Sequence, residues 1–105
     1  MTTHDLHDQF ETVEVADSFL ARVRGVMFRD LPESYVLVHE WDRVAERATH
    51  TFGSSDPIDA YWVVDDVVVA HEWLVQWGGS ATHEGDTLLQ TRGGPDIAVG
   101  DRITY

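Results

Sequence analysis

The stretch IDAYWVVDDVVVAHEW, residues 58–73, is the part of the sequence that decides the fold. Its two arms are rich in β-branched and aromatic residues, which are typical of β-strands. Asp65 and Asp66 separate the arms, and aspartate tolerates the positive φ angles that a two-residue hairpin turn requires. The sequence therefore predicts a β-hairpin with strands over 58–64 and 67–73, and residues 75–77 extend the second arm.

Segments of similar character lie on both sides of this hairpin and are separated by turn residues. We expect further strands at 10–16, 35–41, 48–52, 87–91 and 103–105. We expect loops at 53–57 and 78–86, where glycine, serine and aspartate are frequent. Residues 42–48 have some helix propensity, but their spacing favours a loop or a hairpin turn. Many short strands with closely spaced turns predict a mainly β fold, a small β-sandwich or barrel.

One short α-helix is expected near the N-terminus, over residues 18–24. Asp17 is suited to the N-cap position, where its carboxylate accepts hydrogen bonds from unpaired backbone N–H groups. Gly25 is suited to ending the helix in a left-handed conformation. The apolar side chains of Phe19, Leu20 and Val23 fall on one side. A helix this short needs packing against a larger element, which we expect to be the sheet.

The sequence around this helix also resembles a known family. VADSFLARVRGVMF (15–28) is followed by Thr51-Phe52, by Pro57-Ile58-Asp59, by LLQT (88–91) with Gly94, and by GDR (100–102). In this order the blocks resemble the family called domain of unknown function 192, over about residues 13–103. The resemblance implies a small β-sandwich of jelly-roll type that carries one helix, and it implies no established activity.

The chain departs from that family pattern at three positions. Gly53 stands where the family usually has methionine, and Gln90 and Arg92 stand where it usually has glutamate and proline. If the late strand of the family carried a catalytic carboxylate, this chain would lack it.

The chain length and composition indicate one globular domain. A chain of 105 residues is long enough for a single core, which we assign to residues 10–105 after a flexible tail at 1–9. There is no cysteine, no signal-peptide pattern and no apolar run long enough to span a bilayer. We therefore expect a cytoplasmic protein, and a monomer.

The charge balance is strongly acidic, with 19 Asp and Glu against seven basic residues and a formal net charge of −12. All seven basic residues are arginine. The composition indicates an acidic surface adapted to a salty cytoplasm, as in haloarchaea, because molar salt screens carboxylate repulsion. Arginine usage in a high-GC genome is the alternative. An acidic surface also disfavours nucleic acids and anionic membranes as partners, since phosphate binding requires a basic patch.

The sequence carries no metal-ligand, phosphate-loop or dinucleotide motif, so we expect no metal and no cofactor and assign no catalytic residue. Four residues are candidate ligand contacts: His50, Phe52, Asp59 and Arg24. Asp59 begins a strong strand, where aspartate is disfavoured, so it either contacts a ligand or caps the preceding loop. His50 alternates with Phe52 on one strand face, and Arg24 belongs to the local concentration of positive charge formed with Arg22 and Arg29.

Four tryptophans are many for so small a domain. On an extended strand Trp73 and Trp77 share one face with His71 and Val75. Core packing is the default role of tryptophan, whereas an exposed pair would form a platform for a sugar or another flat ligand.

Two functions follow from these observations. The first, which we prefer, is a non-catalytic binding or accessory module whose partner, a small molecule or a protein, lies near His50, Asp59 and the loop at 53–56. The second is a small hydrolase- or lyase-type enzyme that uses Asp59 and His50 as an acid–base pair. The enzyme requires the two side chains to lie within hydrogen-bond reach in a pocket, whereas the binding module predicts exposed aromatic residues.

Overall fold

The computed structural model describes residues 2–16, 33–51, 56–92 and 96–105, and these contain seven strands and one short helix. The elements are β1 (Thr3–Asp5), α1 (Leu6–Gln9), β2 (Thr12–Ala16), β3 (Tyr35–His50), β4 (Ile58–Val64), β5 (Val67–Leu74), β6 (Ser80–Thr91) and β7 (Arg102–Thr104). The helix predicted at 18–24 lies outside the described residues.

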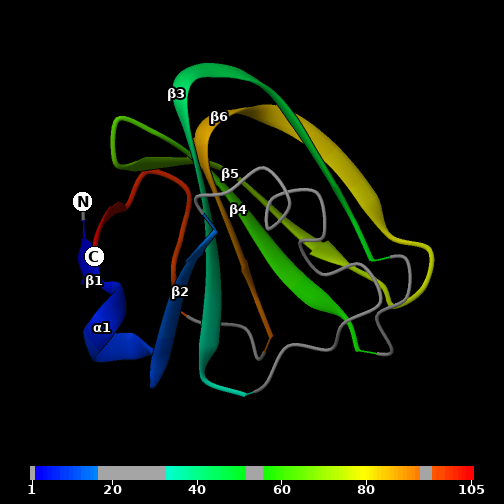
Figure 1. Ribbon diagram of the computed structural model, residues 1–105, viewed down its shortest axis with the longest axis horizontal. Coiled ribbons are helices and arrows are strands. Elements are labelled where there is room, and N and C mark those ends of the chain that lie inside the picture. The colour runs from blue at the N-terminus through cyan, green and yellow to red at the C-terminus, as the bar shows by residue number, and fades with distance from the viewer. Residues whose placement is uncertain (1, 17–32, 52–55, 93–95) are drawn as a thin grey trace.

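The strands form one mixed sheet in the order β1-β7-β5-β4-β6-β3-β2. The sheet curls into a half-barrel, with the N- and C-terminal ends beside each other next to α1 (Figure 1). The pairs β1–β7 and β2–β3 are parallel, and the other pairs are antiparallel. The prediction of a small, mainly β, barrel-like fold is confirmed. The structure also has one short helix near the N-terminus, but this helix is α1 at Leu6–Gln9 and not the segment 18–24 for which a helix was predicted.

The β4–β5 hairpin is formed as the sequence predicted. Val64 pairs with Val67 across the turn, and Asp65 and Asp66 adopt φ angles of 50° and 66°. These positive angles are those of a tight hairpin turn whose twist matches the strands. A register shift follows between Trp62 and Val63, which marks a β-bulge.

The long strands β3 and β6 correct two expectations: the loop at 42–48, and the loop at 78–86 from residue 80 onward. The two strands pair from Val36–Thr91 at one end to His50–Ser80 at the other, and they bend together over the sheet (Figure 1). Strand propensity is weak in these segments, but pairing and packing against the sheet override it. The indole Nε1 of Trp62 donates to the carbonyl oxygen of Arg47 at 2.7 Å, which ties the bent arm to β4.

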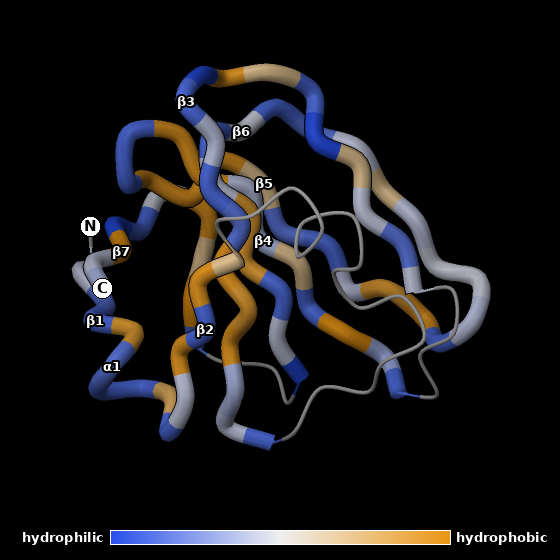
Figure 2. Tube along the Cα trace, in the orientation of Figure 1, coloured by the Kyte–Doolittle hydropathy of each residue, from blue (hydrophilic) through white to orange (hydrophobic). Residues whose placement is uncertain are grey.

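Alternating residues of β4 divide the apolar side chains into two clusters. Tyr61 and Val63 belong to the cluster that includes Leu6 of α1, and Ala60 and Trp62 belong to the other. Figure 2 shows apolar residues concentrated on the central strands and hydrophilic residues on α1 and over much of the bent arm. The central strand β4 is therefore buried on both faces, which accounts for its nearly continuous apolar sequence.

The flexible tail expected at 1–9 is incorrect for residues 3–9, which form β1 and α1. Leu6 is fully buried, and β1 pairs with β7 from Thr3–Arg102 to Asp5–Thr104. The imidazole Nε2 of His4 lies 2.7 Å from Oδ2 of Asp101, which fastens the two ends of the chain together. The polar composition of the segment concealed this role because a single apolar side chain, Leu6, anchors the helix.

In the described segments no helix is long and apolar enough to cross a membrane.

Candidate functional site

Asp59 and His50, two of the four candidate residues, lie on different strands of the sheet. Asp59 is on β4 opposite Thr91, with an exposed fraction of 6%, and His50 is the last residue of β3 opposite Ser80, where it is exposed. Their partners on β6 are therefore eleven positions apart. The other two candidates, Phe52 and Arg24, lie outside the described residues.

The described partner of Asp59 is His71 on the neighbouring strand. Nε2 of His71 lies 2.9 Å from Oδ1 of Asp59, and the imidazole stacks on the Tyr61 ring with centroids 4.3 Å apart and planes 4° apart. The Asp59 side chain is 8% exposed and that of His71 is 35% exposed. A buried carboxylate thus orients a histidine whose outer part is open to solvent.

The β-bulge explains why the sequence did not reveal this pair. The Asp65–Asp66 turn alone would place Tyr61 opposite Ala70 and turn His71 to the other face of the sheet. The bulge shifts the register by one residue, so that Tyr61 pairs with His71. A one-residue shift in strand pairing moves a side chain to the opposite face of the sheet. No turn residue in the sequence indicates that such a shift occurs here.

Tyr61, whose ring stacks on His71, is the third residue of this cluster. Burial, followed by the negative charges of Asp59 and Asp96, raises the pKa of its hydroxyl above the ordinary value of 10.0. The phenol therefore stays protonated at any physiological pH, and its ring serves as the flat support for His71.

Two tryptophans are exposed, one opposite Asp59 on β5 and one in the turn that follows this strand. Trp73 is directly opposite Asp59 in the β4–β5 ladder and is 59% exposed, and Trp77 in the turn after β5 is 60% exposed. Val69 at the bulge of β5 and Val75 just after the strand are also exposed, at 44% and 47%. By contrast Trp62 is fully buried, so core packing accounts for that tryptophan and not for the exposed pair.

The expectation that residues 75–77 extend this strand is wrong, because β5 ends at Leu74 and the chain then turns. We use the name β5 face for His71 and Trp73 on the strand together with Val75 and Trp77 in the segment that follows it.

The backbone of Trp77 has a φ angle of 66°, which is rare for a bulky residue. The turn around it is fixed by hydrogen bonds from Gly78 N to Gln76 O, at 2.8 Å, and from Gly79 N to Val75 O, at 3.1 Å. A left-handed conformation costs roughly 1–2 kcal/mol for a residue with a Cβ atom. An exposed side chain offsets little of that cost, so folding alone does not explain a tryptophan here.

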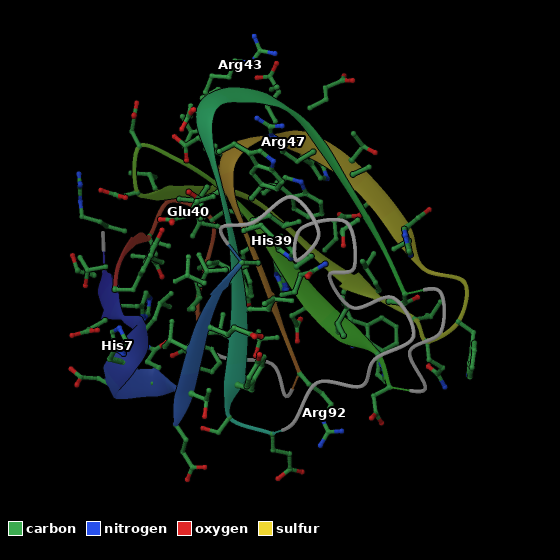
Figure 3. All side chains as sticks on the ribbon, viewed as in Figure 1. His7, His39, Glu40, Arg43, Arg47 and Arg92 are labelled. Atoms are coloured by element: carbon green, nitrogen blue, oxygen red, sulfur yellow. The ribbon has the colours of Figure 1, made fainter. Side chains whose placement is uncertain are left out.

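A second polar cluster lies buried under the bent arm. Nε2 of His39 donates to Oε1 of Gln90 at 2.7 Å, and Nε2 of Gln90 donates to Oγ1 of Thr49 at 2.5 Å. Figure 3 shows His39 in the interior between β3 and the central strands. These side chains are at most 5% exposed, and they join the bent arm to the central sheet.

Gln90 in β6 and Arg92 just after it are the two residues that depart from the family pattern in this region. Each of them contacts other residues of the chain. Gln90 bridges His39 and Thr49, and Arg92 pairs with Asp56 at 2.7 Å and with Glu33 at 3.6 Å. Both residues hold separate segments together. Among the described residues, no group of three or more His, Cys, Asp or Glu side chains could hold a metal ion.

Comparison with known proteins identifies the fold and no more. The chain matches a protein of Sinorhizobium meliloti 1021 that is provisionally described as a transcription regulator, with a TM-score of 0.74 and 17% identity over 86% of this chain and 78% of the other. It also matches a protein of unknown function from Novosphingobium aromaticivorans DSM 12444, with a TM-score of 0.75 and 19% identity over 91% and 75%. No known family profile matches the sequence, and no curated protein matches it. At these identities the chain shares its fold with two bacterial proteins.

Proposed function

We propose that this chain is a non-catalytic binding module, and that its ligand lies on the β5 face. The observation that carries this proposal is the exposure of Trp73 and Trp77, at 59% and 60%, in a domain that buries Trp62 completely. Large exposed aromatic side chains on a small acidic protein favour a ligand-binding role. We also propose that the chain is a member of the domain of unknown function 192 family, on the sequence blocks quoted above.

The ligand class that fits this surface is a flat, hydroxyl-bearing molecule such as a sugar ring. An indole face stacks on the apolar face of a sugar, and the neighbouring His71 offers a polar edge for a hydroxyl group. Asp59 holds that imidazole in place through the 2.9 Å contact. The binding surface therefore combines an aromatic platform with one oriented polar group.

The experiment is a calorimetric titration with neutral hexoses and their oligosaccharides, using the wild type and the Trp73→Thr variant. Threonine keeps the strand propensity of this position, so the fold is retained. We expect the variant to bind at least tenfold more weakly. Val99→Ala is the matched control, because Val99 is also 59% exposed but lies in the turn before β7. Equal binding by wild type and Trp73→Thr, or no binding of any sugar, contradicts the proposal.

A small acid–base enzyme is the second candidate, and the Asp59–His71 contact favours it. A carboxylate that orients a partly exposed imidazole is a common arrangement for a general base. In this candidate His71 takes the role that the sequence suggested for His50. A hydrolase screen with ester and glycoside chromogenic substrates tests it, and activity lost in His71→Gln but kept in His50→Gln would support it.

The proposed setting is the cytoplasm of a salt-adapted organism, with the protein as a monomer. The net charge of −12 supports this setting and disfavours nucleic acids and anionic membranes as partners.

A further inference from the structure

Trp77 is the central residue of a γ-turn of a rare kind. Gly78 N donates to the carbonyl oxygen of Gln76 at 2.8 Å, and the φ angle of Trp77 between them is 66°. A γ-turn with a positive φ angle at its central residue is strained, and such strain persists only where the surrounding structure fixes it. The turn therefore needs support from a group outside its own three residues.

Thr51, the first residue after β3, supplies that support. Its Oγ1 donates to the carbonyl oxygen of Val75 at 2.6 Å, with a longer contact of 3.3 Å to the carbonyl oxygen of Gly79. The same Oγ1 accepts from Gly79 N at 2.9 Å, and Thr51 N donates to the carbonyl oxygen of Gly79 at 2.9 Å. Thr51 is fully buried. One buried hydroxyl group thus joins the two ends of the segment 75–79, at whose centre Trp77 lies.

Thr51 itself is fixed by the sheet. The β3–β6 ladder ends at His50–Ser80, and the hydrogen bond from Thr51 N to Gly79 O continues it by one residue on each strand. Trp73 belongs to the same sheet through the pairing of β5 with β4. The hydrogen bonds of Thr51 therefore hold the backbone of Trp77 in place relative to Trp73.

We propose that Thr51 is a positioning residue of the β5 face, whose hydroxyl group keeps the strained turn formed and so fixes the place at which Trp77 contacts the ligand. This inference rests on the proposed function, in which Trp77 is part of the binding surface. A surface that is ordered before the ligand arrives avoids the entropic cost of ordering it on binding. Without the hydroxyl group the turn relaxes toward the negative φ angles that tryptophan favours, and the affinity falls.

The experiment compares Thr51→Val, which keeps the shape of the side chain and removes the hydroxyl group, with Thr51→Ser, which keeps the hydroxyl group. NMR relaxation of the ligand-free protein measures the order of the Trp77 and Gly78 backbone amides. We expect their order parameters to fall from about 0.85 to below about 0.6 in Thr51→Val and to keep the wild-type value in Thr51→Ser. Calorimetric titration with oligosaccharides of neutral hexoses should show binding weakened by about fivefold or more in Thr51→Val only.

Thr49→Val is the matched control, because it removes another buried threonine hydroxyl group, two residues earlier in the chain. Oγ1 of Thr49 accepts from Nε2 of Gln90. Its loss should lower stability while leaving the Trp77 amide and sugar binding unchanged. Equal loss of order in both variants, or a Trp77 amide that stays ordered in Thr51→Val, overturns the positioning role whatever the sugar result.

Hydrogen exchange in the wild type gives a test that needs no variant. The Gly79 amide donates to a buried hydroxyl group, so it should exchange about tenfold or more slowly than the Gly78 amide, whose bond lies in the exposed turn. Equal exchange of the two amides contradicts the role of Thr51. If no sugar binds while the relaxation and exchange results are as expected, the proposed function fails and the role of Thr51 in fixing the turn is supported.

Discussion

Trp77 has an unfavourable backbone conformation and an exposed side chain. A substitution at this residue can therefore change the stability of the fold and the binding of a ligand in opposite directions. Its φ angle of 66° favours asparagine, which adopts the left-handed region more readily than tryptophan. We expect Trp77→Asn to raise the free energy of unfolding by up to about 1 kcal/mol while weakening sugar binding. Urea denaturation and calorimetry measure the two quantities. A loss of stability would show instead that the indole packs on the folded protein.

Asp101 gives the fold a specific sensitivity to acid. The hydrogen bond from His4, followed by the backbone N–H of Ala98, lowers the pKa of this carboxyl below its ordinary value of 3.8. A lowered folded-state pKa adds stability that is complete above the ordinary value and is lost as the pH falls through the folded-state pKa. We expect thermal unfolding to depend less on pH in Asp101→Asn than in the wild type between roughly pH 5 and pH 2, the range in which carboxyl groups titrate.

The control for this prediction is Asp8→Asn, an exposed carboxylate on α1. It should keep the pH dependence of the wild type. An unchanged pH profile in Asp101→Asn would contradict the role of Asp101.

At the scale of elements, the turn between β5 and β6 depends on one of two adjacent glycines. A Cβ atom on Gly79 would lie 2.6 Å from the carbonyl oxygen of Val75 and 2.9 Å from Cβ of Leu74, whereas one on Gly78 would meet nothing within 4 Å. We expect Gly79→Ala to lower the free energy of unfolding by about 1–3 kcal/mol, because backbone must move. Gly78→Ala should change it by less than about 0.5 kcal/mol. Chemical denaturation of both variants checks this, and equal effects would contradict it.

The elements also show where sequence reasoning succeeds. The β4–β5 hairpin was predictable because its turn chemistry is local, with Asp65 and Asp66 supplying the positive φ angles. The strand segments at 42–48 of β3 and 80–86 of β6 were not predictable, because polar and small residues there form strands only through pairing with each other and packing on Trp62. Asp59 was singled out because aspartate is disfavoured in a strand, but its contact with His71 depends on a bulge that no local pattern encodes.

For the whole molecule, the net charge of −12 predicts a stability that increases with salt. The screening length falls from about 10 Å at 0.1 M to about 3 Å at 1 M salt, which weakens repulsion among surface carboxylates. We expect the midpoint of thermal unfolding, followed by circular dichroism, to rise by roughly 5 °C or more between 0.1 and 2 M KCl, a change of about 1 kcal/mol. Sucrose at matched osmolality is the control, since it does not screen charge. An equal rise in sucrose, or none in KCl, would contradict salt adaptation.

The fold class of the whole molecule followed from strand and turn spacing, but the β1–β7 edge of the sheet did not. That edge is formed by β1 and β7, which are three residues each and lie almost a full chain length apart in sequence. Neither has a pattern long enough to be assigned from local propensity.

The parallel pairing of β1 with β7 makes the backbone nearly a ring. Arg102 N donates to Thr2 O at 2.9 Å, so only the length of one three-residue strand separates the last residues from the first. A spacer of about four or five residues could join Tyr105 to Thr2, and new ends could then be opened within the exposed Asp65–Asp66 turn. Such a circular permutant would keep every strand neighbour, and the β4–β5 pairing, now the most local in the chain, would join its first and last strands.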